Sequence, residues 1–165
     1  MPTSQRVPVM YLITVVLLMG VLPAASILIE HFGFGSGGDI WDLVGKWFVF
    51  WSVGFRLALA GLRQIVDPAF TARTIFEIED KTAQVIVQEL GFANLAVGAL
   101  AIVTLLAPQW LAAAALVGAI FYGLAGAKHV IKGDRNRNET IATVSDLFIF
   151  AVLTAYLVAI SLQPD

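Results

Sequence analysis

Long apolar stretches alternate with short polar ones along the whole chain. Five stretches hold about 20 mostly apolar residues each, the length at which an α-helix crosses the hydrocarbon core of a bilayer. They cover residues 9–29, 43–62, 85–107, 110–127 and 141–162. The pattern predicts an all-α protein, a polytopic transmembrane helical bundle that forms one integral membrane domain over residues 1–165.

The connections between these stretches carry residues that end helices. Residues 32–39 (FGFGSGGD) are rich in glycine, and residues 133–138 (GDRNRN) have the composition of a polar turn. Asp67 and Pro68 end the second span, and an N-cap followed by a first-turn proline also starts helices. We expect a short helix at residues 68–80 that lies on the membrane interface, because its sequence mixes apolar and charged residues.

The composition excludes a soluble globular protein. Hydrophobic residues make up 59% of the chain and charged residues only 13%, with a mean hydropathy of +0.85. A soluble domain carries about twice that charged fraction. The net charge of −2 gives no footprint for nucleic-acid binding, and the absence of cysteine excludes disulfides and thiolate metal sites. Membrane lipids are the partners that the composition implies.

The basic residues orient the chain in the membrane. Eight of the ten lie in segments on one side of the predicted bundle, and the segments on the other side contain none. Because basic loops stay in the cytoplasm, we expect a cytoplasmic N-terminus and an external C-terminus in a bacterial inner membrane. The eight are Arg6, Arg63, Arg73, Lys81, Lys128, Lys132, Arg135 and Arg137.

The first span has an alternative interpretation as a secretory signal peptide. Arg6, an apolar run over residues 9–22, and the small residues Ala24 and Ala25 fit such a segment. The apolar run continues to Ile29, which favours a retained membrane-spanning helix.

Two basic residues lie inside the second span. Lys46 follows Asp42 by four residues near the outer end, so the two share a helix face, and the lysine can extend its ammonium outward. Arg56 lies seven residues from Arg63, about 10 Å deep from the inner end.

Acidic and polar residues of other spans reach the depth of Arg56. Counting from the inner ends places Gln88 and Glu89, His129 and Asp146 in the same third of the bilayer. We expect Arg56 to form a buried pair with Glu89 or Asp146, because a lone charge in hydrocarbon costs about 2.5–3.5 kcal/mol on insertion scales. The group is interpreted as a structural ion pair, as a ligand, lipid-headgroup or proton-handling site, or as unrelated residues that reach toward the membrane surface.

Small residues recur at four-residue spacing along the fourth span. Ala115, Ala119, Gly123 and Ala127 form this ridge, and such spacing lets helices approach closely. We expect the ridge to bury against another helix, within the chain or in a homo-oligomer.

Catalytic and metal-binding arrangements are not evident. His31 and His129 are the only histidines and belong to opposite membrane faces, so one chain does not offer both to the same haem. No serine has a neighbouring histidine, and no phosphate-binding loop is complete. We therefore expect no catalytic residue, metal site or cofactor.

About half of the chain, residues 51–129, resembles DoxX-like small membrane proteins. The resemblance rests on RLALAGLRQIVDPAFTAR (56–73), ELGFANLAVGALAIVTLLAP (89–108) and the following small-residue helix that ends in Lys128 and His129. It implies a compact helical bundle, although the extra N-terminal span departs from the usual four-helix layout. Some members of that family are associated with quinone-linked sulfur oxidation or oxidative-stress complexes.

Three functions are compatible with these patterns. The first is a non-enzymatic, oligomeric subunit or accessory of a membrane complex, since the short loops leave no room for a soluble domain. The second is a small transporter or channel that uses Arg56, Glu89 and Asp146. The third is a quinone- or lipid-handling redox partner.

The charge distribution makes a testable prediction about topology. A single cysteine introduced at Asp165 in this cysteine-free chain should react with an impermeant maleimide in intact cells. Cysteines placed in the 63–82 and 128–139 segments should react only after permeabilisation. Labelling of position 165 only in permeabilised cells would contradict the assigned orientation.

Overall fold

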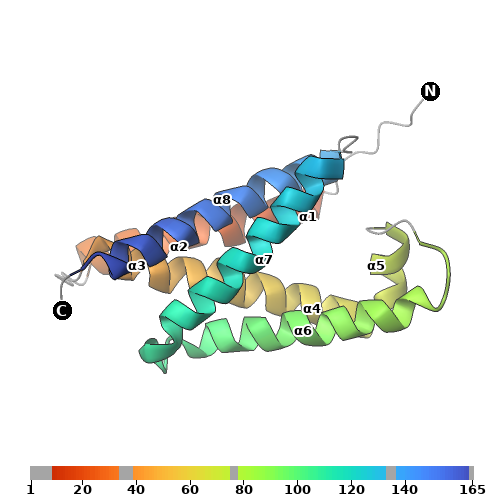
Figure 1. Cartoon of the computed structure of the whole chain (residues 1–165), viewed down its shortest axis with the longest axis horizontal. Helices are drawn as coiled ribbons and strands as arrows, with labels where there is room; N and C mark the ends of the chain where they lie inside the picture. Colours follow the sequence, from red (N-terminus) through yellow and green to blue (C-terminus); the bar gives the residue numbers. More distant parts are fainter. Residues whose placement is uncertain (1–8, 34–38, 75–77, 133–136, 164–165) are drawn as a thin grey trace.

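The computed structural model of the protein describes residues 9–33, 39–74, 78–132 and 137–163, and the regular structure in these ranges is helical. Five helices are long and apolar enough to cross a membrane, which confirms the predicted all-α bundle (Figure 1). They cover Val9–Gly33, Ile40–Val66, Ala83–Val103, Pro108–Lys132 and Glu139–Ser161. Several sequence predictions concern positions outside the described residues: Arg6, the glycine-rich segment 34–38, Arg135 and Asp165.

The first two spans contain π-helical turns, which the sequence pattern did not predict. The first long helix, Val9–Gly33, consists of α1 (Val9–Val16) and α2 (Leu22–Leu28) with π-helical turns at Leu17–Val21 and Ile29–Gly33. The second long helix, Ile40–Val66, consists of α3 (Ile40–Phe48), a π-helical stretch (Val49–Phe55) and α4 (Arg56–Val66). The remaining elements are α5 (Pro68–Thr74), α6 (Ala83–Val103), a 3₁₀ turn (Pro108–Trp110), α7 (Leu111–Lys132) and α8 (Arg137–Ser161).

The predicted interfacial helix is present but shorter than expected. Asp67 caps α5 by accepting a hydrogen bond from the Phe70 amide at 3.2 Å, with Pro68 as the first helical residue. The helix extends over Pro68–Thr74, whereas the prediction extended to residue 80. Asp80 lies in the connection and accepts a 2.9 Å hydrogen bond from the Thr82 amide, which lowers the pKa of Asp80 below its usual value.

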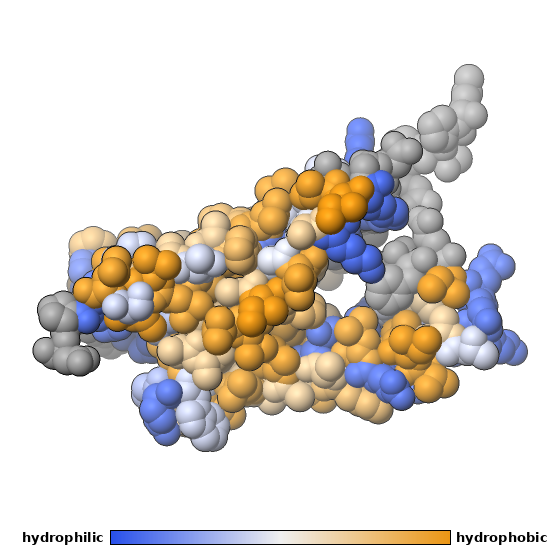
Figure 2. All heavy atoms as spheres, in the orientation of Figure 1, coloured by the Kyte–Doolittle hydropathy of each residue, from blue (hydrophilic) through white to orange (hydrophobic). Residues whose placement is uncertain are grey.

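Two closely packed helix pairs organise the bundle. α4 packs along α6, and α7 packs along α8, while the first long helix packs on the second. The two pairs diverge at the end of the bundle that carries α5 (Figure 1). Figure 2 shows an opening between them there, with hydrophilic side chains on its rim.

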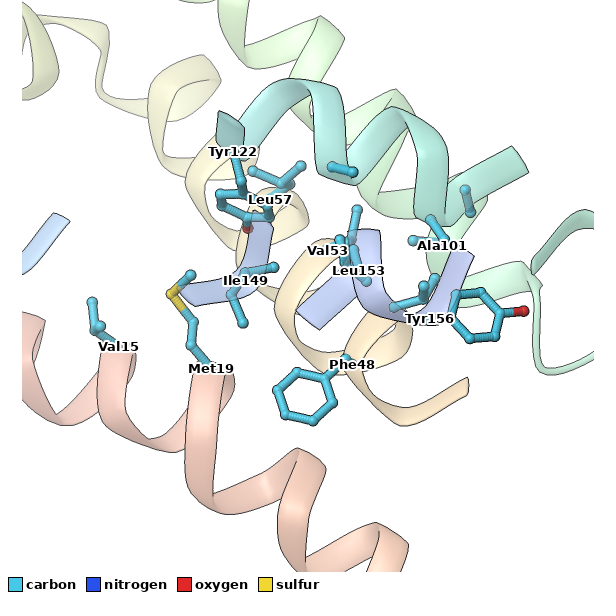
Figure 3. Close-up of a cluster of buried hydrophobic side chains, with 14 residues drawn as sticks. Val15, Met19, Phe48, Val53, Leu57, Ala101, Tyr122, Ile149, Leu153 and Tyr156 are labelled. Carbon is cyan, nitrogen blue, oxygen red and sulfur yellow. The ribbon is translucent and has the colours of Figure 1, made fainter. Parts of the chain in front are cut away.

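The hydrophobic core lies where the second long helix crosses α7 and α8. Its side chains come from the first and second long helices, from α7 and α8 and, through Ala101, from α6, and Figure 3 shows them gathered together. The largest of the fully buried ones are Val49, Val53, Leu57, Tyr122, Ile149 and Leu153.

A proline in the first long helix explains one polar contact in this core. In the π-helical turn the Leu22 amide donates to the Leu17 carbonyl, five residues earlier. The next bond of that pattern, to the Leu18 carbonyl, would come from residue 23, which is a proline without an N–H. The fully buried Ser52 hydroxyl donates to this carbonyl at 3.0 Å. A side chain of the second long helix thus replaces the missing backbone donor, as membrane interiors require.

Glycines permit the close contact between α4 and α6. A Cβ atom on Gly61 would lie 2.6 Å from the Gly91 carbonyl oxygen, and one on Gly98 would lie 2.5 Å from the Ala58 nitrogen. Because the nearest atoms belong to the backbone, a side chain at either position requires the helices to separate. The small-residue ridge predicted on the fourth span is therefore not the closest helix contact in the molecule.

The α4–α6 contact yields a prediction for two matched substitutions. Gly98→Ala should destabilise the protein by about 1–3 kcal/mol through overpacking and lower the thermal unfolding midpoint in detergent. Gly20→Ala provides the control, because nothing lies within 4 Å of its added Cβ and alanine favours a helix. Equal midpoints for the two variants would contradict the close α4–α6 packing.

Candidate functional site

A buried ion pair joins the second long helix to α8. Arg56 is the first residue of α4, immediately after the π-helical stretch that packs on α7. Its Nη2 lies 3.6 Å from Oδ1 of Asp146, and the exposed fractions of the two side chains are 17% and 7%. Of the two carboxylates that sequence depth offered to Arg56, the structure pairs it with Asp146.

Two tyrosines surround the Arg56 guanidinium. The Tyr122 ring of α7 lies 5.6 Å from the Arg56 Cζ and provides a cation–π contact. The Tyr122 hydroxyl is fully buried and donates a hydrogen bond to the Ser52 carbonyl. Tyr11 of α1 also lies within electrostatic range of Arg56 and Asp146. The cluster therefore draws on α1, the second long helix, α7 and α8.

The Asp146 carboxylate is not saturated with hydrogen bonds. Its Oδ1 is enclosed by protein and accepts no hydrogen bond from any described residue, since 3.6 Å to Arg56 is an electrostatic contact. His129, near the end of α7, lies within electrostatic range of this carboxylate. Since buried acceptors normally have a donor, this oxygen retains the capacity to bind one more proton donor.

Glu89 and Gln88, which sequence depth placed near Arg56, do not contact this cluster. Glu89 is exposed and forms no ion pair or hydrogen bond with the described residues. It lies about 140° around the helix axis from Asn94, which is buried against α4. Gln88 instead donates to the Ile65 carbonyl at 3.4 Å. The residue count from the helix end does not give the direction in which a side chain points.

A second polar cluster lies near the opposite end of the two long helices. Lys46 Nζ lies 2.8 Å from both carboxylate oxygens of Glu30, and Trp47 Nε1 donates to the same carboxylate at 2.8 Å. Lys46 therefore pairs with Glu30 of the first long helix and not with Asp42, which shares its helix face and is exposed. Trp51 Nε1 adds a 3.0 Å hydrogen bond to the Ser26 hydroxyl.

The small-residue ridge of α7 faces the interior of the chain for most of its length. Ala115 and Ala119 are buried, with exposed fractions of 0% and 5%. A Cβ on Gly123 would lie 2.8 Å from the Phe150 ring of α8. Ala127 is exposed and does not continue this contact.

An apolar groove runs between the first long helix and α8. It encloses about 650 Å³. Its lining includes Leu12, Val16, Val144 and Phe148, and His129 is not part of it. Among the described residues, no group of three or more histidine, aspartate or glutamate side chains lies close enough to hold a metal ion.

The chain belongs to a family described as a family of unknown function (DUF6790), whose model matches residues 9–163. No curated protein and no solved structure matches the chain. The family match therefore covers all five membrane-spanning helices and adds no activity to what the geometry shows.

The Arg56–Asp146 pair makes a prediction about mutational coupling. Arg56→Leu should cost about 3–5 kcal/mol, because it leaves the Asp146 carboxylate unpaired in a low dielectric. Combining Arg56→Leu with Asp146→Leu should cost less than Arg56→Leu alone, as measured by unfolding in mixed micelles. Glu89→Gln serves as the control and should add independently to Arg56→Leu. Additive losses for Arg56 and Asp146 would show that the two charges do not interact.

Proposed function

We propose that this small multi-pass membrane protein is a non-enzymatic subunit or accessory of a larger membrane complex. The observation that carries the proposal is that the buried Arg56–Asp146 pair joins two helices of the bundle to each other. Its two members come from different long helices, and the Tyr122 side chain that contacts Arg56 also bonds the Ser52 carbonyl. Such an arrangement holds helices in register, whereas a reaction centre presents reactive groups toward a substrate.

The other polar contacts inside the spans support the same proposal. Glu30 is bound to Lys46 and Trp47, and Asn94 donates to Gln64 at 2.9 Å. These contacts link helices to one another. The connections between the described helices are short, so the chemistry of a complex would come from other subunits.

The proposal includes an orientation in the bacterial inner membrane. The end of the bundle that carries α5 also carries exposed basic residues, and we assign this end to the cytoplasm. The described members are Arg63, Arg73, Lys81, Lys128, Lys132 and Arg137.

A small transporter is the second candidate function. The enclosed Asp146 Oδ1 accepts no hydrogen bond from the described residues, and Figure 2 shows an opening between the helix pairs at the α5 end. A carboxylate with this spare capacity in a membrane interior is suited to taking up a proton.

The redox-partner hypothesis has less support. The resemblance to DoxX-like proteins suggested it, and the apolar groove has room for a lipid or quinone tail. However, the groove is not lined by His129, so the structure does not join a tail site to a proton-accepting side chain.

The mass of the gently extracted particle tests the subunit proposal. Protein extracted in native nanodiscs should form particles whose protein mass exceeds one 17.7 kDa chain, as measured by native mass spectrometry. A particle with a single chain and no other protein would contradict the proposal. Proton uptake by liposomes containing the wild-type protein, lost in Asp146→Asn, would then favour the transporter.

A further inference from the structure

The α6 helix lies at the edge of the bundle and leaves one face without a partner. Its opposite face packs on the second long helix through Gly91, Asn94 and Gly98. The uncovered face runs the length of the span and is apolar except for one carboxylate. It consists of Val85, Glu89, Phe92, Ala93, Ala96, Ala99 and Val103.

The carboxylate of Glu89 requires an explanation on this face. It lies six residues from the start of α6, about 9 Å along the helix axis. No described residue forms an ion pair or hydrogen bond with it. Because charged groups in spans normally face a partner or a water-filled cavity, an exposed carboxylate points to a partner beyond the part of the chain that the structure describes.

The outward face of α7 carries a matching cation. Lys128 is exposed four residues before the end of α7, about 6 Å along the axis. It has no ion pair with the described residues either. Apolar side chains with high exposure precede it on the same face, among them Ile120 at 54% and Leu124 at 69%. The face thus combines an apolar surface with Lys128, while Lys132, four residues further on, is paired to Glu139.

The two charges lie at the same end of the bundle but do not meet within one chain. α6 begins and α7 ends at the end that carries α5 (Figure 1). The two helices are joined at the other end, through the Pro108–Trp110 turn, and they diverge toward the charged end. Figure 2 shows the opening that separates the two helix pairs there.

We infer that the uncovered α6 face docks against the outward α7 face of a second copy of this chain, with Glu89 of one copy paired to Lys128 of the next. The inference rests on the proposed subunit role and names one partner. Charge complementarity selects this partner, because the same chain offers the missing cation at the same membrane end. Ala93, Ala96 and Ala99 are small enough to let the two helices approach closely.

The contact has a consequence for symmetry. The two docking faces belong to different helices, so each copy presents both halves of the interface. Such a head-to-tail contact builds a closed ring when the rotation between copies closes. A two-fold contact would satisfy the same charge pairs only if the α6 face and the α7 face of each copy lay in one shared patch.

Charge reversal tests the inference with two differently tagged copies in one cell. Wild-type copies should copurify. Copies that both carry Glu89→Lys, or both Lys128→Glu, should copurify at least about tenfold less, because like charges then face each other. One Glu89→Lys copy and one Lys128→Glu copy should copurify again, since each contact between the two copies regains an opposite-charge pair.

A matched control isolates the proposed contact from general charge effects. Lys81→Glu makes the same charge change as Lys128→Glu at an exposed position at the same end of the bundle, outside the spans, and should leave copurification unchanged. Thermal midpoints of the single variants should stay close to that of the wild type, because neither Glu89 nor Lys128 pairs with another of the described residues.

The outcomes separate this inference from the proposed function. Failure of wild-type copies to copurify would overturn the inference, as would a loss in the single variants that mixing does not restore. If the extracted particle then contains one copy with other proteins, the subunit proposal stands and the inference alone fails. A particle with one chain and nothing else overturns both.

Discussion

Polar groups inside a bilayer have no bulk water to bind, and this constraint shapes the interior of the bundle. Tyr122 connects the two polar arrangements that follow from this constraint, the Arg56–Asp146 pair and the hydrogen bond to the Leu18 carbonyl. The Tyr122 ring contacts the Arg56 guanidinium, and the Tyr122 hydroxyl donates a hydrogen bond to the Ser52 carbonyl. The Ser52 hydroxyl in turn donates a hydrogen bond to the Leu18 carbonyl. The charge pair and the repair of the proline-containing helix are therefore parts of one network. Removing Arg56 takes the counter-charge from Asp146, and removing the Ser52 hydroxyl takes this donor from the Leu18 carbonyl.

The two ends of the bundle differ in the contacts that hold their helices together. At one end Glu30, Lys46 and Trp47 fasten the first two long helices together. At the other end α4 and α6 form a tight glycine-mediated pair that diverges from α7 and α8. The Arg56–Asp146 pair joins helices on the two sides of this divergence. Relative movement of the two helix pairs would change the Arg56–Asp146 pair together with the Tyr122–Ser52 hydrogen bond, which crosses the same divergence.

The sequence predicted features that depend on length and depth, and it missed features that depend on direction. Apolar length was enough to find five spans, and depth was enough to list Asp146 as a partner for Arg56. Depth placed Glu89 beside Arg56 as well, although it points away from the bundle. Lys46 pairs with Glu30 of another helix, at a sequence separation of 16, and local spacing in the sequence does not reveal such a partner. The close approach at Gly61 and Gly98 also required knowledge of which helices are neighbours.

The π-helical stretch Val49–Phe55 determines the direction in which Arg56 points. Hydrogen bonds that span five residues take up an extra residue relative to an α-helix, and one residue corresponds to about 100° of rotation. Deleting one residue there would leave the span apolar and long enough, yet it would turn the guanidinium away from Asp146. In evolutionary terms, a single-codon insertion or deletion in this stretch would separate the arginine from Asp146 while the hydropathy profile stays nearly the same.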